Sequence, residues 1–386
     1  MSTLRTGRLG ANLSALRDHN AAVVLGLLRD AGEHGASRSE LAARTALTPQ
    51  AVSKITARLR AAGLAAEAGR RTSTGGKPAT VLRLVPGAAH AIGLHLDRDA
   101  VTATLVDLAG TALATRTAPL AFGADAGAVL DAVTAEVGAV RAEAARAGRE
   151  AVAVLGAGVA APGPLDHRSG VLHRVTGFPQ WDGFPLRDAL GDRLGLPVVL
   201  DKDTNAAALG LALRGPRDAA ARGAGSFAYL HLGTGLGAGL VLGGGVHRGA
   251  RTGAGEFGHQ VLQLDGPPCP CGRRGCVEVL CLRAVAEGDT PRAARLLGTA
   301  AANLVQLLDI DLVLLGGRTV LADAGPYVRG VRAELPATVP VAVTPGGERT
   351  VVEGAAELVL APLFGRSGPA ATTRPDERTI GLSGGI

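Results

Sequence analysis

Four potential metal ligands stand close together in the chain. His259 is followed by Cys269, Cys271 and Cys276, a spacing of H-x9-C-x-C-x4-C. An imidazole and three thiolates fill the tetrahedral shell that Zn²⁺ prefers, and a closed shell is typical of a structural zinc rather than a catalytic one. The alternative is a loose thiol cluster. The remaining cysteine, Cys281, lies in an apolar stretch and is interpreted as a small core residue.

The charge of the chain is concentrated at its N-terminal end. Residues 1–85 hold 13 Lys+Arg and 5 Asp+Glu, a net of +8, whereas residues 86–386 hold 27 and 29, a net of −2, which sum to the +6 of the whole chain. A basic module on a nearly neutral body indicates a polyanionic partner. The module has no aromatic residue to stack on bases, which favours double-stranded DNA over RNA or single strands. The alternative is a basic face that is merely solvated.

The pattern within residues 1–85 predicts three helices and a hairpin. Helices are expected over 17–31, over 39–44 with Ser37 or Ser39 as the cap, and over 49–62 after the start signal Thr48-Pro49. Two short strands, 65–69 and 79–84, enclose a basic, glycine-rich tip. This is the order of a winged helix-turn-helix, and the alternative is a helical module that docks a protein.

On the third helix, Val52, Ile55 and Leu59 share one face, and the opposite face carries short polar side chains that can reach base edges. Arg58 and Arg60 flank that face for phosphate contacts. The residues predicted to bind DNA are Thr48, Gln50, Ser53, Lys54, Arg58, Arg70, Arg71 and Lys77.

The remaining chain reads as an α/β body over residues 88–365, in which strands end repeatedly at glycine turns. The segment 366–386, rich in Gly, Pro, Thr and charge, is expected to be a disordered tail. Residues 1–20 have no apolar run, and the one long charge-free window, 223–246, holds nine glycines in 24 residues. We therefore expect a cytoplasmic, nucleoid-associated protein without a signal peptide or a membrane-spanning helix.

Several motifs of the body resemble the ROK family (repressors, open reading frames and sugar kinases). The most specific are GAGEFGH at 253–259 and C-x-C-G-x-x-G-C-x-E at 269–278. The resemblance continues through APGP at 161–164, DTNAAA at 203–208, LGTGLG at 232–237 and LGG at 315–317, and covers residues 91 to 365. It implies a two-lobed, actin-like body (the sugar kinase/hsp70/actin fold) with a zinc loop and a ligand cleft between the lobes. Members with an N-terminal winged helix-turn-helix are sugar-responsive transcription regulators, and the bare body is typically a sugar kinase.

The resemblance also implies roles for single residues. Asp203 stands where the family places its catalytic base, in an Asn-Asp-x-Asn run whose first Asn is Lys202 here. The implied sugar-binding residues are Gly163, Asp203, Glu256, His259 and Glu278, with His259 also a zinc ligand. Other interpretations stay open, because Asp203 can cap the helix that follows, Glu256 can be a solvated loop carboxylate, and Glu278 can be a first-turn helix residue.

The resemblance fails on the nucleotide side. Kinases of the family open their first hairpin with Asp-x-Gly-Gly-Thr, whereas the corresponding stretch here, from His95 to Ala100, has side chains in place of both glycines. We therefore predict a DNA-binding regulator of carbohydrate genes, a repressor, that senses a sugar or oligosaccharide in a degenerate kinase cleft and works as a homo-oligomer, a dimer or a tetramer. The alternatives are an ATP-dependent sugar kinase that kept a DNA-binding arm, and a zinc sensor.

Overall fold

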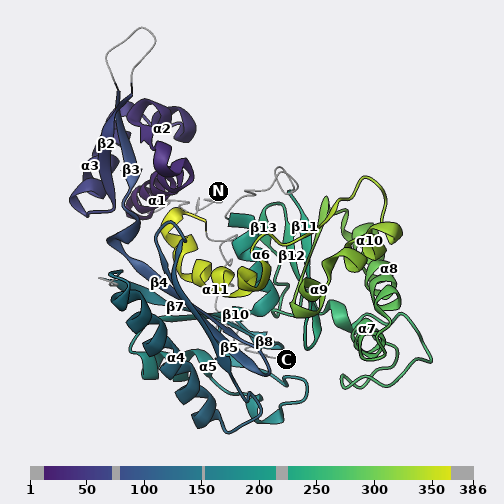
Figure 1. Cartoon of the computed structure of the whole chain (residues 1–386). Helices are drawn as coiled ribbons and strands as arrows, with labels where there is room; N and C mark the ends of the chain where they lie inside the picture. Colours follow the sequence, from purple (N-terminus) through teal and green to yellow (C-terminus); the bar gives the residue numbers. More distant parts are fainter. Residues whose placement is uncertain (1–12, 72–78, 150–152, 214–224, 367–386) are drawn as a thin grey trace, which may run out of the picture.

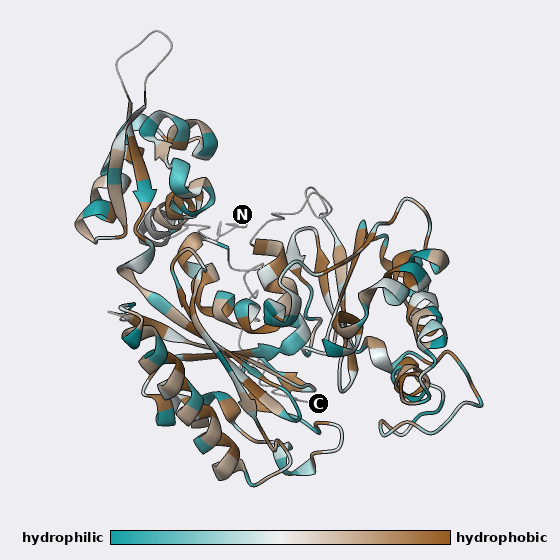
Figure 2. Ribbon diagram, viewed as in Figure 1, coloured by the Kyte–Doolittle hydropathy of each residue, from teal (hydrophilic) through white to brown (hydrophobic). Residues whose placement is uncertain are grey.

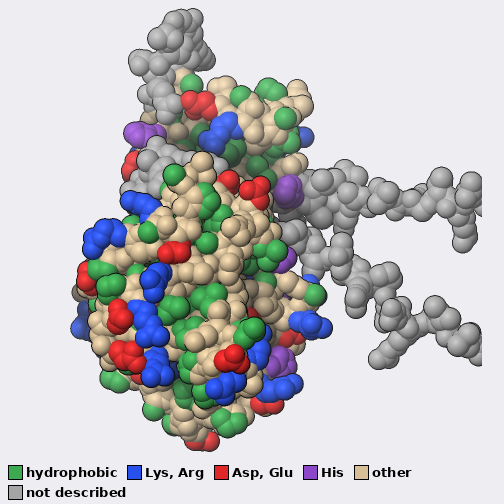
Figure 3. Space-filling model, turned by 90° about the vertical axis from the view of Figure 1, so that its right-hand side faces the viewer, with side chains coloured by type: hydrophobic (Ala, Val, Ile, Leu, Met, Phe, Trp, Pro, Cys, Tyr) green, Lys and Arg blue, Asp and Glu red, His purple; other side chains and the backbone are tan. Residues whose placement is uncertain are grey.

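A small N-terminal module sits beside a larger body made of two lobes (Figure 1). The computed structural model describes residues 13–71, 79–149, 153–213 and 225–366. Each lobe contains a five-stranded sheet, and a pair of helices lies between the two sheets. Basic and acidic side chains are interspersed over the face of the body shown in Figure 3, in agreement with the nearly neutral charge of residues 86–386.

The N-terminal module contains three helices and a three-stranded antiparallel sheet. The second helix begins with a capping box, in which Ser37 accepts from the N–H of Glu40 at 3.2 Å and Glu40 accepts from the N–H of Ser37 at 2.7 Å. Thr48 caps the third helix by accepting from the N–H of Ala51 at 3.2 Å, so both helices begin within a residue of their predicted starts. The elements are α1 (Leu13–Ala31), β1 (Ala36–Ser37), α2 (Arg38–Thr45), α3 (Pro49–Ala61), β2 (Ala65–Arg71) and β3 (Ala79–Leu84), with strand order β1-β3-β2.

The first lobe is built on a mixed sheet with the order β10-β7-β4-β5-β6. Strands β4, β7 and β10 run parallel, so their carboxyl ends meet at one edge, and β5 and β6 extend the sheet in antiparallel fashion. Helix α4 packs against β5 and β6. The elements are β4 (His90–Leu96), β5 (Ala100–Asp107), β6 (Ala112–Pro119), α4 (Ala126–Arg146), β7 (Val154–Ala161), β8 (Leu165–Asp166), β9 (Val171–Leu172), α5 (Leu186–Leu194) and β10 (Val198–Lys202).

The second lobe repeats this plan with the strand order β13-β12-β11-β14-β15. Helices α7, α8 and α10 share an apolar core with one face of the sheet, and α6 packs against β11 and β12. In Figure 2 the strands and the inner faces of these helices are brown, which marks the apolar side chains that hold the lobe together. The elements are α6 (Asp203–Leu213), β11 (Phe227–Leu232), β12 (Leu236–Leu242), β13 (Gly245–Val246), α7 (Val277–Ala286), α8 (Thr290–Leu308), β14 (Leu312–Gly316), α9 (Arg318–Ala322), α10 (Ala324–Glu334) and β15 (Val341–Val343).

Helix α11 (Thr350–Leu360) crosses back between the lobes. It packs against β4 and β7 of the first lobe and against α6, and a Cβ added at Gly354 would lie 2.0 Å from the carbonyl oxygen of Ala206. Only glycine permits this close approach. Helix α11 was not predicted from the sequence, because its 11 residues are mostly apolar and have only Glu353 and Glu357 as charged side chains.

A buried junction joins the N-terminal module to the first lobe. Val24, Leu25 and Leu28 of α1 form one apolar cluster with Leu360 and Phe364, which lie at the end of α11 and in the short 3-10 helix η7 (Ala361–Phe364). Val24, Leu25 and Leu28 share this cluster with the core of the N-terminal module itself, and another face of α1 meets the body, where Gly26 approaches Phe364 and Arg29 pairs with Glu357. α1 itself begins at Leu13 rather than at residue 17.

A bidentate ion pair lies inside this junction. Nη1 and Nη2 of Arg29 donate to the two carboxylate oxygens of Glu357, at 3.0 and 2.5 Å. The side chains of Arg29 and Glu357 are only 7% and 1% exposed. The Arg29 guanidinium also lies 4.6 Å from the ring centroid of Phe364. Arg366, predicted to begin a disordered tail, donates to the carbonyl of Leu213 at 2.7 Å and pairs with Asp30 at 2.5 Å, whereas residues 367–386 lie outside the described residues.

None of the helices in the described segments is long and apolar enough to cross a lipid bilayer.

Candidate functional site

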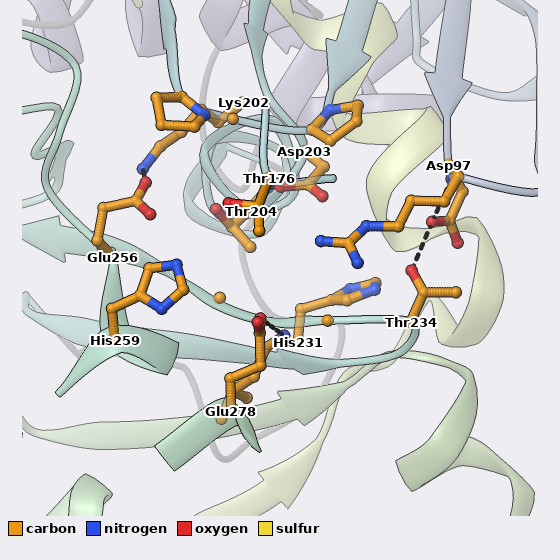
Figure 4. Close-up of a pocket in the computed structure, with 18 residues that line it drawn as sticks. Asp97, Thr176, Lys202, Asp203, Thr204, His231, Thr234, Glu256, His259 and Glu278 are labelled. Atoms are coloured by element: carbon orange, nitrogen blue, oxygen red, sulfur yellow. Dashed lines mark hydrogen bonds and ion pairs between the residues drawn. The ribbon is translucent and has the colours of Figure 1, made fainter. Parts of the chain in front are cut away.

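A pocket of about 90 Å³ opens between the two lobes (Figure 4). The first lobe contributes the residues that follow β4, β7 and β10, and the second lobe contributes the β11–β12 turn, the loop before α7 and the first turn of α7. Ligands of open α/β sheets bind at such carboxyl ends of strands. The five residues implied to bind a sugar all line this pocket: Gly163, Asp203, Glu256, His259 and Glu278.

Two of the lining carboxylates are engaged by the protein. Glu256 pairs with the buried ammonium group of Lys202 at 3.0 Å, and Lys202 also donates to the carbonyl of Ala254 at 2.5 Å. Glu278 accepts from the N–H of Leu236 at 2.8 Å. Each carboxylate keeps lone pairs that can accept from a ligand hydroxyl, so the pocket has the acceptors that a polyol requires.

Asp203 is the first residue of α6, and its carboxylate accepts from the N–H of Thr204 at 2.6 Å. This contact fits the interpretation of Asp203 as a residue that satisfies the start of the helix. The side chain is half-buried and also faces the pocket, so the two roles are compatible.

Several pocket residues were not predicted from the sequence. Asp97 and Arg98 come from the β4–β5 turn, Thr204 and Thr234 lie within the motifs at 203–208 and 232–237 but had no implied role of their own, and Thr176 and His231 belong to no motif. The missed residues are Asp97, Arg98, Thr176, Thr204, His231 and Thr234.

Polar contacts bridge the two lobes at the β4–β5 turn. Asp97 accepts from the hydroxyl of Thr234 at 2.9 Å, and Arg318 of the second lobe reaches Asp99 at 2.8 Å and Asp97 at 3.6 Å. A second cavity, of about 390 Å³, lies beside this bridge and is lined in part by Arg318 and Arg349. Acidic side chains thus occupy the turn whose glycines would approach phosphates in a kinase of the family, and they are matched to cations of the protein itself.

Two titratable groups at this bridge have shifted pKa values. Burial lowers the pKa of His95, although Asp203 and Asp97 act in the opposite direction. Burial acts to raise the pKa of Asp97, but the charge of His95, the N–H of Arg98, the hydroxyl of Thr234 and Arg318 together lower it. Both shifts make the bridge sensitive to acid.

The predicted metal ligands come together at the rim of the pocket. The ligating atoms of His259, Cys269, Cys271 and Cys276 all lie within 4.8 Å of one another. The Sγ atoms of Cys271 and Cys276 are 3.7 Å apart, as are Sγ of Cys269 and Nδ1 of His259. Tetrahedral zinc with Zn–S bonds of about 2.3 Å has edges of roughly 3.8 Å, so the cluster fits that ion. His259 belongs to both the cluster and the pocket.

The pKa values of Cys271 in the cluster and of the spare Cys281 are shifted in opposite directions. Burial acts to raise the pKa of Cys271, but hydrogen bonds with Arg273 and the neighbouring thiols lower it to about 7. Burial raises the pKa of Cys281 to about 12, and its Sγ lies 3.7 Å from the carbonyl of Ala293 in the core of the second lobe. The interpretation of Cys281 as a core residue is confirmed.

The polar face of α3 is exposed as predicted. Val52, Ile55 and Leu59 are buried, whereas the side chains opposite them point to solvent. Arg60 forms an exposed ion pair with Glu67 of β2 at 3.0 Å. The predicted DNA-binding residues on the exposed face are Gln50, Ser53, Lys54 and Arg58, with Thr48 as the helix cap; Arg70 and Arg71 lie in β2 with undescribed side chains, and Lys77 lies outside the described residues.

Comparison with known proteins identifies the family. The body, with two lobes and a ligand pocket between them, has the architecture of actin-like sugar kinases. The ROK family profile matches residues 91–286, about half of the chain, and the chain therefore belongs to the ROK family. Its fold is similar to that of a ROK family transcriptional regulator, a homolog of the E. coli MLC protein, with a TM-score of 0.71 and 22% identity over 91% of this chain and 97% of that one.

Other relatives match the body. The ROK hexokinase of Thermus thermophilus is 31% identical with a TM-score of 0.55 over 71% of this chain and 98% of that one. The glucokinase of Thermotoga maritima is 41% identical over 32% of this chain and 38% of its own length. The xylose repressor of Caldicellulosiruptor bescii is 28% identical over 63% of this chain and 59% of its own length. This chain thus spans less than two thirds of these two curated relatives.

Proposed function

We propose that the protein is a transcription regulator, a repressor of carbohydrate genes, whose affinity for double-stranded DNA is set by a sugar or oligosaccharide in the cleft. One observation carries the proposal: a module of three helices and a three-stranded sheet, with an exposed polar α3 face, is joined through a buried interface to a cleft lined by hydroxyl acceptors. The regulators among the relatives support it, since a xylose repressor matches 63% of this chain.

The junction between α1 and the body explains how sugar binding in the cleft would change DNA binding. The cleft opens between the lobes, and α1 is held to the first lobe by the Arg29–Glu357 pair and the surrounding apolar side chains. A sugar that closes the cleft would therefore move the DNA-binding module together with the first lobe. In a homo-oligomer, a dimer or a tetramer, two recognition helices must meet half-sites one turn apart, about 34–36 Å, and a rotation of the lobes would spoil that spacing.

DNA binding can be tested without a known operator. Selection of duplexes from a random library by the purified protein is expected to yield one consensus with two half-sites. Lys54→Ala is expected to weaken binding of that duplex by about tenfold while sugar binding is unchanged. Arg141→Ala, an exposed residue of α4, is the matched control for loss of a positive charge. No enrichment of any sequence, or equal loss in both variants, would contradict the proposal.

We also propose that the cluster of His259, Cys269, Cys271 and Cys276 holds a structural Zn²⁺ ion. The distances between its ligating atoms fit tetrahedral zinc, and when bound the ion would hold the loop before α7 in place beside Glu256 and Glu278. Cys271→Ser is expected to lose the metal, measured by elemental analysis, and to lower the melting temperature. Cys281→Ala is expected to keep the metal. Zinc that exchanges near cellular free levels, with DNA release following it, would instead support a zinc sensor.

A kinase is the second candidate, because Asp203 faces the pocket and the glucokinases and hexokinase match the body. Phosphoryl transfer requires a base for the sugar hydroxyl and a seat for the triphosphate. The acidic β4–β5 turn disfavours that seat. A coupled assay of ADP release with a sugar panel decides between the two functions, and turnover abolished in Asp203→Asn would establish the kinase.

A further inference from the structure

The cleft contains two cationic side chains, of which one forms an ion pair and the other does not. Among the described residues that line the pocket, Lys202 and Arg98 are the only Lys or Arg side chains. Lys202 is 3% exposed and is neutralised by Glu256 at 3.0 Å. Arg98 is half-buried, and within the described segments no carboxylate forms an ion pair with its guanidinium, which lies 5.9 Å from the ring centroid of Phe178.

The position of the Arg98 guanidinium is given by the residues around it. A Cβ added at Gly235 would lie 3.4 Å from Nη2 of Arg98 and 3.0 Å from Oε2 of Glu278. The guanidinium therefore extends from the β4–β5 turn of the first lobe across to the β11–β12 turn of the second lobe. Gly235 has no side chain, and this leaves space beside the charged head at the point where the two lobes face each other.

The other charged groups of the pocket already have partners within the protein, of two kinds. Glu256 is paired with Lys202 and Asp97 with Arg318. Glu278 and Asp203 each accept a hydrogen bond from a backbone N–H, that of Leu236 and that of Thr204, and form no ion pair within the described segments. A guanidinium that is partly desolvated and lacks an anionic partner carries a cost, which a ligand anion relieves. Planar carboxylates and phosphates are the groups that a guanidinium binds best, through two parallel hydrogen bonds.

We infer that the effector is an anionic sugar, one whose carboxylate or phosphate binds Arg98 while its hydroxyls bind the acceptors of the second lobe. The inference rests on the proposed function and narrows its ligand class. Arg98 belongs to the first lobe, whereas Glu256, His259 and Glu278 belong to the second. An anionic sugar thus contacts both lobes, and a neutral sugar of the same shape leaves the contact with Arg98 unmade.

The test is isothermal titration of the full chain with matched sugars. Glucose, galactose and mannose are compared with their uronates and their 6-phosphates, and inorganic phosphate is the sugar-free arm. At least one anionic sugar is expected to bind about tenfold or more tighter than its neutral parent. A preference for the uronate identifies a carboxylate as the group at Arg98, and a preference for the 6-phosphate identifies a phosphate.

Substitutions assign that preference to Arg98. Arg98→Gln and Arg98→Ala are expected to reduce the ratio of anionic to neutral affinity to about one, and Arg98→Lys is expected to retain part of it. Arg295→Ala, an exposed residue of α8, is the matched control and keeps the full ratio. The melting temperature and the affinity for the neutral sugar show that each variant is folded.

The outcomes separate this inference from the proposed function. A neutral sugar that binds as tightly as its anionic partners, or a ratio that survives in Arg98→Gln, overturns the inference and leaves the regulator intact. Inorganic phosphate that binds as tightly as a sugar phosphate also overturns it. Binding of none of the sugars contradicts both. ADP release that is lost in Arg98→Gln would assign Arg98 to phosphoryl transfer and overturn both in favour of the kinase.

Discussion

The first lobe meets the N-terminal module and the cleft end of the second lobe through contacts of opposite character. Its junction with α1 is apolar and buried, and encloses the Arg29–Glu357 pair. Its junction with the second lobe at the cleft consists of polar contacts around Asp97 and Asp99, where Arg318 is 45% exposed. Buried contacts of this kind resist separation, whereas exposed ion pairs are weak and screened by salt. We therefore expect the lobes to separate at the cleft end, about the buried packing of α6 and α11 that joins them, while the N-terminal module moves with the first lobe.

The largest effect is expected from breaking the buried pair. Glu357→Ala leaves the Arg29 guanidinium without its partner and should lower the free energy of unfolding by about 3–5 kcal/mol. Urea denaturation measures the loss, and hydrogen exchange is expected to show α1 as the most exposed element. The double variant Arg29→Met with Glu357→Leu should recover most of the stability. A loss of unfolding free energy below about 1 kcal/mol would mean that this junction is no stronger than the contacts at the cleft.

A smaller effect is expected where α1 approaches the backbone after α11. A Cβ at Gly26 would lie 2.9 Å from the carbonyl oxygen of Phe364, whereas a Cβ at the exposed Gly138 of α4 would meet nothing within 4 Å. Gly26→Ala should therefore destabilise the protein by about 1–2 kcal/mol. Gly138→Ala should stabilise it by about 0.5–1 kcal/mol, since alanine favours a helix. Equal effects of the two substitutions in thermal unfolding would show that α1 is loosely attached.

Lowering the pH should weaken the contacts at the cleft and reduce the stability of the folded protein. The pKa of His95 lies below its usual 6.5 in the folded protein, so the unfolded chain takes up a proton first and stability falls as the pH drops below 6.5. The pKa of Asp97 lies below 3.8, and its contribution is lost as the pH falls further. Urea midpoints between pH 7 and pH 5 are expected to decline. His95→Gln should flatten the decline, and the exposed control His173→Gln should leave it unchanged.

The smallest effect is expected at the exposed end of the cleft. Arg318→Ala removes contacts with Asp97 and Asp99 and should cost about 0.2–1 kcal/mol. The loss is expected to shrink at high ionic strength, because salt screens exposed charges. Unfolding at low and high salt measures it. A loss as large as that of Glu357→Ala, or one that salt does not change, would mean that the lobes are locked at the cleft.

Local sequence patterns were sufficient to predict those features that depend on a single segment of the chain. The cap at Thr48 predicted the start of α3, and the spacing of the metal ligands predicted a cluster that the structure contains. The five residues implied by the family motifs also line one pocket. Helix α11 was not predicted, because a short, mostly apolar segment with only Glu353 and Glu357 to mark a helical period is also compatible with a buried strand.

Sequence by itself determined the identity of the chemical groups: a basic N-terminal module, a His/Cys set that fits zinc, and a β4–β5 turn without glycines. Only the tertiary structure decided which of those groups remain available to a ligand. Lys202 and Arg98 are both cations in the sequence, yet folding brings Glu256 within 3.0 Å of the first, whereas no carboxylate of the described chain forms an ion pair with the second. The reason is that pairing depends on which segments meet in space, and the partners here are more than 50 residues apart along the chain.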